Sequence, residues 1–329
     1  MLASGFTIPQ SYDNLLPVGH RNRMQPPKLH DHILSTQIAN KDSQVMPLDY
    51  DALMGTRMSD KPTIYSDKDA MLYALGIGFG HDPLDQHELP FVFENQLLKT
   101  VPTMASILTP GDLLADCGWD YSLMVLGEQK LDLFRPLPEK GRLLTNSRVV
   151  SVFDKGPDIG AVISVESEVR MAKDDTALFT VGSTVIARGD GGFGGPTGKN
   201  AEPHRLPKRE ADMSCDLETQ PDQALLFRLC RDRNPLHADP SLARQAGFER
   251  PILHGLCTYG IACRAILKTI CEYDHTLITG FNTRFTAPVY PGDTITTEMW
   301  QDRNIVSFRC LVKERNTVVI DNGMCTLVA

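Results

Sequence analysis

From Cys230 to Gly260 the sequence reads CRDRNPLHADPSLARQAGFERPILHGLCTYG, and this segment is the most informative part of the chain. Its first part carries a carboxylate, an amide and an imidazole on Asp232, Asn234 and His237, which fall within six residues. Pro235 lacks a backbone N–H and restricts the residue before it, so this span cannot form a regular helix. The sequence therefore predicts a shaped loop that directs three polar side chains into a common space.

Two helix signals follow the loop. Asp239–Pro240 is typical of an N-cap followed by proline at the first helical position, and the short helix that it opens should end near Gly247. The apolar run of residues 256–270 is long enough for a buried helix beginning at His254–Gly255. Gly255 would then offer a free backbone N–H at the positive end of this helix, where no Cβ obstructs a ligand. An acid–base pair beside such a donor is a catalytic arrangement.

Length and composition limit the class of protein. The chain has 329 residues, enough for two domains, and its 42% apolar and 22% charged residues are typical of a soluble globular protein. The net charge of −8 argues against a nucleic-acid partner, but a local basic rim would suffice for a phosphate-bearing ligand. No stretch reaches the roughly 18 uninterrupted apolar residues of a membrane helix, so we expect no membrane insertion.

Cysteine usage and the chain ends bear on the compartment. The eight cysteines are scattered without a C-x-x-C pair, which predicts reduced core thiols in an intracellular protein and no zinc site. The amino end lacks the layout of a secretory signal, and the carboxy end, CTLVA, is not a peroxisomal address of the S-K-L type. We expect a soluble protein, cytoplasmic in a bacterium; in a eukaryote a peroxisomal location stays open despite the missing signal.

The chain divides into four segments. Residues 1–45 lack periodicity and are expected to form a poorly ordered arm, 46–188 a first repeat, 189–212 a linker rich in glycine and proline, and 213–329 a second repeat. The first repeat has a helix signal over 66–78, opened by a capping box of Ser66 and Asp69, and strand patterns at 142–153, 161–169 and 176–187. The second has the 255–270 helix and strand patterns at 282–289, 294–300, 305–312 and 317–328, with a turn at Pro291–Asp293.

The linker contains a G-x-G-x-x-G pattern at Gly189, Gly191 and Gly194, directly after a strand pattern. A dinucleotide-binding site requires a helix to begin there and a parallel strand to follow. Pro196 and Pro203 forbid that helix, so we interpret the segment as a linker and not as a nucleotide site.

The string from Asp232 to Thr258 resembles the signature of the (R)-specific 2-enoyl-CoA hydratases, the MaoC-like branch of the hot-dog superfamily. In that family D-x-N-P-L-H-x-D-P is followed by P-I-L-H-G-L-C-T, and the match here is nearly complete. The resemblance covers residues 45–328 and implies an α+β double hot dog. Each of its two repeats would be a long central helix wrapped by an antiparallel sheet, with the sheets joined edge to edge. It also implies a homodimer.

The resemblance further implies one active site per chain. The first repeat lacks D-x-N-P-L-H, and its helix carries Tyr73 and Ala74 where chemistry would need an acid and a base. In two-repeat hydratases the amino-terminal half has lost catalysis and accommodates the acyl chain. The glycines at 76, 78 and 80 would let this helix shift or unwind, and we hypothesise that the region opens a tunnel for the acyl tail.

Hydration of an α,β-unsaturated thioester needs a base for the water, a proton for C2 and stabilisation of the thioester oxygen. Asp232 and His237 can share the proton transfers, Asn234 can orient the water, and the Gly255 N–H can serve the enolate oxygen. The resemblance implies these same roles and a syn addition that gives a (3R)-3-hydroxyacyl-CoA. No metal and no cofactor is expected, because coenzyme A is part of the acyl-CoA substrate.

Further ligand contacts are implied by the resemblance. Leu126 and Gly127 match a histidine–glycine pair that touches the ligand, and with leucine in place of histidine the backbone contact of Gly127 is what carries over. Lys155 matches a lysine that faces the coenzyme A phosphates, and Phe285 matches an aromatic residue lining the cleft. The predicted substrate-binding set is completed by the loop residues Arg233, Pro235 and Leu236.

Two alternatives stay open from the sequence. A hot-dog thioesterase acts on the same ligand class, but usually with a carboxylate outside an N-P-L-H context. An inactive acyl-CoA-binding double hot dog belongs to a different class, and the intact set of Asp232, Asn234, His237 and Gly255 argues against it. We expect His254 to be a structural hydrogen-bonder and not a second base.

Overall fold

The computed structural model describes residues 48–329 except residues 96, 116, 118–123 and 199–201. The arm predicted for residues 1–45 lies outside the described residues. None of the helices in the described part of the chain is long and apolar enough to cross a membrane. Six of the cysteines are buried thiols, at positions 230, 257, 263, 271, 310 and 325.

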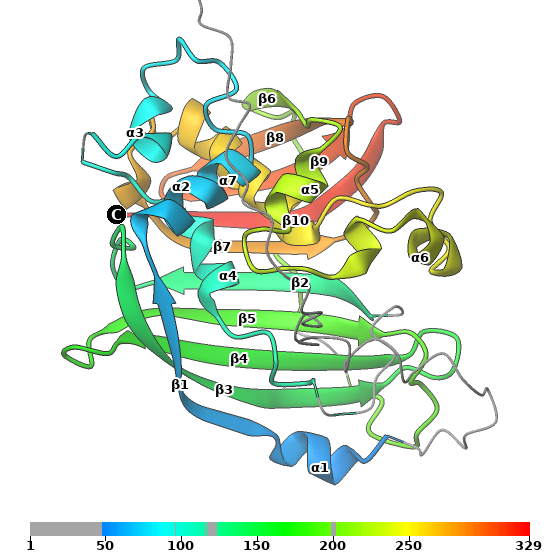
Figure 1. Cartoon of the computed structure of the whole chain (residues 1–329). Coiled ribbons are helices and arrows are strands. Elements are labelled where there is room, and N and C mark those ends of the chain that lie inside the picture. Colours follow the sequence, from blue (N-terminus) through cyan, green and yellow to red (C-terminus); the bar gives the residue numbers. More distant parts are fainter. Residues whose placement is uncertain (1–47, 96, 116, 118–123, 199–201) are drawn as a thin grey trace, which may run out of the picture. The chain divides into compact units, whose positions relative to one another are not determined.

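The described strands form one sheet of ten strands in the order β1-β3-β4-β5-β2-β7-β10-β9-β8-β6, with antiparallel neighbours throughout (Figure 1). The first repeat supplies β1 (Arg57–Tyr65), β2 (Met124–Leu133), β3 (Gly141–Asp154), β4 (Ala161–Met171) and β5 (Ala177–Ala187). The second repeat supplies β6 (Met213–Glu218), β7 (Ile278–Phe285), β8 (Thr294–Asp302), β9 (Ile305–Val312) and β10 (Thr317–Leu327).

The two halves of the sheet join where β2 pairs with β7. Glu128 lies opposite Arg284 in this ladder, and an ion pair with a 2.8 Å N–O distance connects their side chains. The seam makes one continuous surface from the two repeats, which confirms the edge-to-edge arrangement expected for a double hot dog.

Most strand patterns of the sequence are confirmed as β3, β4, β5, β8, β9 and β10. The pattern assigned to 282–289 is wrong in position, because the strand ends at Phe285, ahead of Pro288, which cannot donate to a ladder. The edge strands β1 and β6 and the seam strand β2 were missed. The edge strand β1 exposes most of its length, and β2 buries the polar Gln129, so apolar alternation is absent from β1 and interrupted in β2. The short β6 does alternate, as MSCDLE, and this signal was overlooked.

The central helix of the second repeat is α7 (Gly255–Thr269), which buries most of its residues between the sheet and the first repeat (Figure 1). Its first-repeat counterpart, α2 (Asp67–Gly76), opens with the predicted capping box: the Asp69 carboxylate accepts from the N–H and the hydroxyl of Ser66, both at 2.8 Å. The expectation of a long helix reaching Gly78 is wrong. The chain leaves the helix after Gly76 because Gly78 adopts φ +91°.

The shorter helices lie in the connections. In the first repeat these are α1 (Tyr50–Gly55), α3 (Leu89–Val92), η1 (Pro102–Met104) and α4 (Ala105–Leu108). In the second repeat they are α5 (Gln223–Phe227), η3 (Pro235–His237), α6 (Pro240–Gln245) and η4 (His275–Leu277). As predicted, Asp239 caps α6 by accepting the N–H of Ser241 at 2.7 Å.

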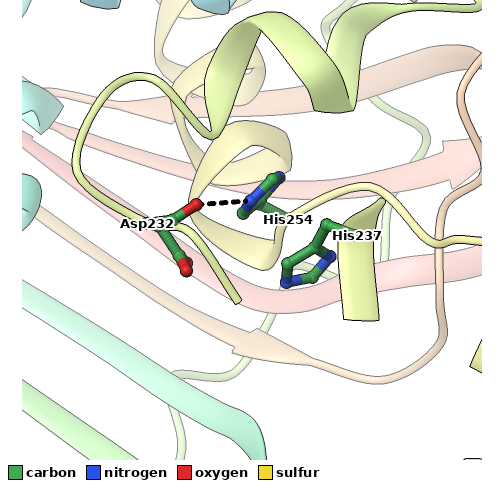
Figure 2. Close-up of side chains that lie close together, drawn as sticks. All are labelled: Asp232, His237 and His254. Carbon is green, nitrogen blue, oxygen red and sulfur yellow. Dashed lines mark hydrogen bonds between the residues drawn. The ribbon is translucent and has the colours of Figure 1, made fainter. Parts of the chain in front are cut away.

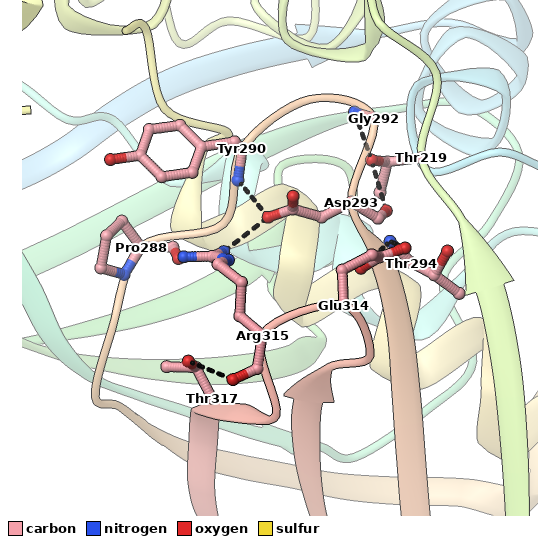
Figure 3. Close-up of polar contacts among 9 residues, drawn as sticks. All are labelled: Thr219, Pro288, Tyr290, Gly292, Asp293, Thr294, Glu314, Arg315 and Thr317. Atoms are coloured by element: carbon pink, nitrogen blue, oxygen red, sulfur yellow. Dashed lines mark hydrogen bonds and ion pairs between the residues drawn. The ribbon is translucent and has the colours of Figure 1, made fainter. Parts of the chain in front are cut away.

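The predicted turn after β7 is held by a polar network (Figure 3). The Asp293 carboxylate accepts the N–H of Tyr290 at 2.8 Å and pairs with Arg315 at 2.6 Å. The Thr219 hydroxyl accepts the N–H of Gly292 at 2.9 Å, which ties the turn to the segment after β6. This network fixes the segment whose Val289 carbonyl accepts the N–H of Leu253, just ahead of α7.

The glycine-rich part of the linker wraps around a carboxylate of the protein. Asp154 accepts the N–H groups of Gly156 and Gly192 on one oxygen, at 2.9 and 2.8 Å, and that of Gly194 on the other at 2.7 Å. These hydrogen bonds lower the pKa of Asp154. The described linker residues contain no helix and no strand that pairs in parallel, so the G-x-G-x-x-G pattern does not build a dinucleotide site.

Candidate active site

The loop ahead of α6 is shaped by its own short polar residues. The Asp232 carboxylate accepts the N–H of Asn234 at 3.2 Å, and the Asn234 side-chain oxygen accepts the N–H of Leu236 at 3.0 Å, which caps η3. Because the amide oxygen of Asn234 is used in this way, its NH2 group is the part left to bind a ligand. Local sequence therefore sets the loop conformation, as residues of this type do in turns.

His237 is held as a neutral base. Its Nδ1 lies 2.9 Å from the carbonyl oxygen of Ile252, and since a carbonyl can only accept, Nδ1 carries the proton. Nε2 is consequently the unprotonated nitrogen. Burial lowers the pKa of His237, against the opposing effects of the Ile252 carbonyl and Asp232, and the side chain is 8% exposed.

His254 lies behind His237 and holds the loop. Its Nε2 donates to the backbone carbonyl of Asp232 at 3.1 Å, and its ring stacks on His237 with centroids 3.7 Å apart and an interplanar angle of 27° (Figure 2). Burial, together with the neighbouring His237, lowers the pKa of His254 to about 2. The prediction of a structural hydrogen-bonder at this position is confirmed.

The ionisable groups are close enough to act on one small molecule. Asp232, His237 and His254 each offer an atom within 4.8 Å of the other two. The Nδ1 proton of His237 and the Nε2 proton of His254 are both donated to backbone carbonyls. The unprotonated Nδ1 of His254 is buried, so the atoms that stay available for chemistry are the carboxylate of Asp232 and Nε2 of His237.

Gly255 begins α7 beside this pair, and its N–H lies in the first turn, where a helix has no internal acceptor. A Cβ built on Gly255 would lie 3.5 Å from the Phe285 ring, so the aromatic residue borders this glycine. Glu128 of β2 lies opposite Arg284 of β7. Gly127 precedes Glu128 and Phe285 follows Arg284, so the seam brings Gly127 and Phe285 close to each other. Leu126, next to Gly127, is half-buried at the register shift of β2.

The other predicted ligand residues differ in how much of each side chain is exposed or unpaired and so able to contact a ligand. Lys155 directs its ammonium group to the carbonyls of Thr197 and Gly198 at 2.7 and 2.6 Å, at the edge of a cavity of about 420 Å³. Arg233 and Pro235 are exposed. Leu236 is 3% exposed and packs in a core cluster with Ala243 and Ile252, so little of its side chain is left for a ligand.

Three residues of the site were missed by sequence reasoning. Phe227 packs its ring against His254 with centroids 5.1 Å apart, and Ile252 supplies the acceptor that orients His237. The charge of Arg228 acts with burial in lowering the pKa of both histidines. Phe227 and Arg228 lie just ahead of the loop. In the sequence Phe227 is indistinguishable from an ordinary apolar helix residue, and nothing there indicates that its side chain points toward His254.

A continuous antiparallel sheet around two helices, with one loop that presents a carboxylate and a neutral imidazole at a helix start, defines a double hot-dog protein with an acid–base site. Residues 64–189 match the MFE-2 hydratase 2 N-terminal domain, and residues 201–325 match the MaoC like domain.

The relatives agree with that class. The chain is 37% identical over 301 residues to Enoyl-CoA hydratase 2, peroxisomal, of Arabidopsis thaliana, covering 86% of this chain and 96% of that protein. It is 36% identical over 288 residues to Enoyl-CoA hydratase ChsH3 of Mycobacterium tuberculosis, covering 85% and 98%. The crystal structure of a MaoC-like dehydratase from Phytophthora capsici has a TM-score of 0.75 at 29% identity, covering 85% and 98%. The protein belongs to the MaoC-like enoyl-CoA hydratase 2 family.

Proposed function

We propose that the protein is an (R)-specific 2-enoyl-CoA hydratase, a hydro-lyase of fatty-acyl-CoA metabolism that reversibly converts trans-2-enoyl-CoA to (3R)-3-hydroxyacyl-CoA. The observation that carries the proposal is the pairing of Asp232 with a buried His237 whose Nδ1 proton is fixed on Ile252, beside the Gly255 N–H at the start of α7. The relatives named as enoyl-CoA hydratases support the same reaction.

The proposed chemistry follows from the atoms that stay available. Asp232 and Nε2 of His237 hold one water, which loses a proton to this pair as its oxygen attacks C3. The pair returns a proton to C2, so that H and OH are added and no proton is gained or lost overall. Both groups belong to one loop and can therefore approach a substrate from one side, as the syn addition implied by the resemblance requires. The Asn234 NH2 group orients the water, and the Gly255 N–H stabilises the enolate oxygen.

The reaction is proposed to need no metal and no separate cofactor. Asp232, His237 and His254 offer one ligand atom each, namely the carboxylate, Nε2 and the buried Nδ1, and the proposed mechanism uses the first two of these atoms to hold the water. Coenzyme A enters as part of the substrate, with Lys155 near its phosphates once the ammonium group leaves the carbonyls of Thr197 and Gly198. A homodimer and, in a eukaryote, a peroxisomal location complete the proposal.

The first repeat is proposed to accommodate the acyl tail, but not through free glycines. A Cβ on Gly76 would lie 3.3 Å from Phe227, and one on Gly78 would lie 2.8 Å from the Arg264 guanidinium. Substitutions there would disturb the core and the residues behind the site, so these positions cannot report on chain length alone. The idea that they unwind the helix freely is replaced by a helix that ends at Gly76 against the second repeat.

The test is an assay of crotonyl-, decenoyl- and hexadecenoyl-CoA with chiral analysis of the product and a parallel measurement of free thiol. We expect (3R)-3-hydroxyacyl-CoA and no thiol release. Release of coenzyme A would identify a thioesterase, and binding without turnover would identify an inactive acyl-CoA-binding protein. Asp232→Asn, assayed beside the wild type, distinguishes turnover at this site from a contaminating activity.

A further inference from the structure

A column of four aromatic rings leads from the first repeat to His237. The ring of Tyr73 on α2 lies 5.9 Å from that of Phe227 on α5, which lies 5.1 Å from His254, which in turn lies 3.7 Å from His237. Tyr73 and Phe227 are fully buried, and His254 is 1% exposed. The column is therefore enclosed in the protein interior and ends on the face of the proposed base.

Hydrogen bonds fix the column at its ends. The Tyr73 hydroxyl shares a hydrogen bond of 3.0 Å with the Thr103 hydroxyl, within the first repeat. His254 donates to the Asp232 carbonyl, and His237 donates to the Ile252 carbonyl, at the other end. The ring plane of His237 is consequently set by a stack on one face and a hydrogen bond along one edge.

His254 is suited to support and not to proton transfer. Its Nε2–H is occupied by the Asp232 carbonyl, and its Nδ1 is buried without a hydrogen-bond partner in the described structure. A neutral imidazole combines a flat face for His237 with a donor for the loop, and phenylalanine or glutamine supplies one of these but not both.

We propose that His254 is a positioning residue, and that the first repeat acts through Tyr73 and Phe227 to press it against His237 and so keep Nε2 of His237 directed at the reacting water. The non-catalytic repeat thereby contributes to catalysis. The inference rests on the role of His237 in the proposed function. It adds a role that the acid–base chemistry alone does not require.

Two substitutions separate the functions of His254. His254→Phe keeps the ring and removes the donor, so we expect kcat to fall by about tenfold with little change in KM, because the Asp232 loop loosens. His254→Gln keeps a donor and removes the ring, so we expect a similar fall together with a change in the pH profile. Turnover within about twofold of the wild type in both folded variants would overturn the inference.

The pH profile gives a readout that loss of folded protein does not. His237 is surrounded by Asp232 on its own loop, Arg228 after α5, and His254 ahead of α7, and burial is the main cause of its lowered pKa. Water admitted by His254→Gln raises the pKa of His237, so the acid limb of kcat/KM should move up by about half a unit or more. In His254→Phe the limb should stay in place. An unmoved limb in both would contradict the support of His237 by the stack.

More distant members of the column provide a graded test if the His254 variants fold poorly. Phe227→Leu removes a supporting ring and should lower kcat by about threefold, whereas Tyr73→Phe keeps the ring, removes only the hydrogen bond to Thr103 and should lower kcat less. Tyr65→Phe is the matched control, because it removes a 2.8 Å hydrogen bond from a buried aromatic ring to the Pro138 carbonyl in the first repeat. Equal losses in Phe227→Leu and Tyr65→Phe would overturn the column.

The same assays distinguish failure of this inference from failure of the proposed function. If His237→Gln retains normal hydration, the assignment of the base fails and the inference fails with it. If His237→Gln is inactive but the folded His254 and Phe227 variants turn over normally, the proposed function stands and the positioning role alone is rejected.

Discussion

The starts of α2 and α7 occupy corresponding places in the two repeats but are closed in different ways. In α2 the Asp69 carboxylate folds back on Ser66 and occupies the helix terminus with a group of the protein itself. In α7 the cap residue His254 makes no capping hydrogen bond from its side chain, and Gly255 follows it. The same fold thus has one helix terminus capped by its own acid and one without a side-chain cap, and the proposed mechanism uses the free N–H of that second terminus.

The repeats also differ in how they use polar residues in the core. The second repeat has His237 and His254 beside the Asp232 loop. The first repeat contributes Glu88, which forms an ion pair of 2.7 Å with Arg264 of α7, and both of these side chains are almost fully buried. Gly80 donates to the second oxygen of Glu88 at 2.8 Å. The first repeat is therefore bound to α7 by this ion pair in the second half of the helix, and also near its start, where the Cys257 thiol donates to the Gly76 carbonyl.

The largest effect should come from removing the groups that only the second repeat has. Asp232→Asn and His237→Gln should each lower kcat by about a hundredfold or more, because each removes one partner of the proton transfers. Steady-state assays with crotonyl-CoA measure the loss, and circular dichroism checks that the variants fold. Near-normal hydration by either folded variant would remove that residue from the mechanism.

Removing the buried ion pair between the repeats should strongly reduce the free energy of unfolding. Arg264→Met leaves Glu88 buried without its cation, and such a loss typically costs about 3–5 kcal/mol of unfolding free energy. Urea denaturation measures it. The double variant Arg264→Met with Glu88→Gln should recover much of the loss, and a single variant as stable as the wild type would show that the pair does not hold the repeats together.

Acid should destabilise the protein through the buried imidazoles of the second repeat. The pKa of His254 is lowered to about 2 in the folded state, whereas an ordinary histidine has a pKa of 6.5. Below pH 6.5 the unfolded chain therefore binds a proton at this residue and the folded chain does not. Stability is full above that pH and decreases below it, by about 2 kcal/mol at pH 5 for this residue. Urea unfolding at pH 7 and pH 5 should show a smaller decrease for His254→Gln; an equal decrease would assign the effect elsewhere.

Closing the open terminus should reduce turnover without unfolding the protein. A Cβ at Gly255 would meet the Phe285 ring at 3.5 Å, an ordinary contact, so Gly255→Ala should fold. In the proposed mechanism the thioester oxygen approaches this N–H, and the added methyl group would hinder that approach. Complete loss of one oxyanion donor typically costs about a hundredfold or more, so partial obstruction should lower kcat/KM by about tenfold. An unchanged kcat/KM would show that a methyl group at this position does not obstruct the thioester, and the requirement for glycine would be rejected.

Opening the sealed terminus should have the smallest effect and should not touch catalysis. Asp69→Asn weakens the capping box of α2, and we expect a loss of about 1 kcal/mol in unfolding free energy with unchanged kcat. Thermal denaturation and the crotonyl-CoA assay together measure both quantities. A loss of turnover as large as that of Gly255→Ala would mean that the two termini do not differ in function.

Much of the site could be predicted because it is written in short-range contacts. Asp232 and Asn234 shape the loop by bonding to backbone groups two residues away, and Asp239 caps α6 in the same manner. Such contacts depend on residue order and not on the rest of the fold. Residue order and hydrophobic pattern were therefore enough to predict the loop at Asp232–His237, the start of α7 and most strands of the sheet, together with the resemblance that these residues carry.

Contacts between residues far apart along the chain could not be predicted, because such partners meet only in the folded protein. Arg264 and Glu88 are separated by 176 residues, and the β2–β7 seam joins residues 156 apart at Arg284 and Glu128. The end of α2 at Gly76, the turning of Lys155 to linker carbonyls and the ring column behind His237 have no periodic signature either. A residue's type fixes which groups it can bind, but which of them reach it is set by how the sheet curves and the helices pack, and that arises only when the whole chain is folded.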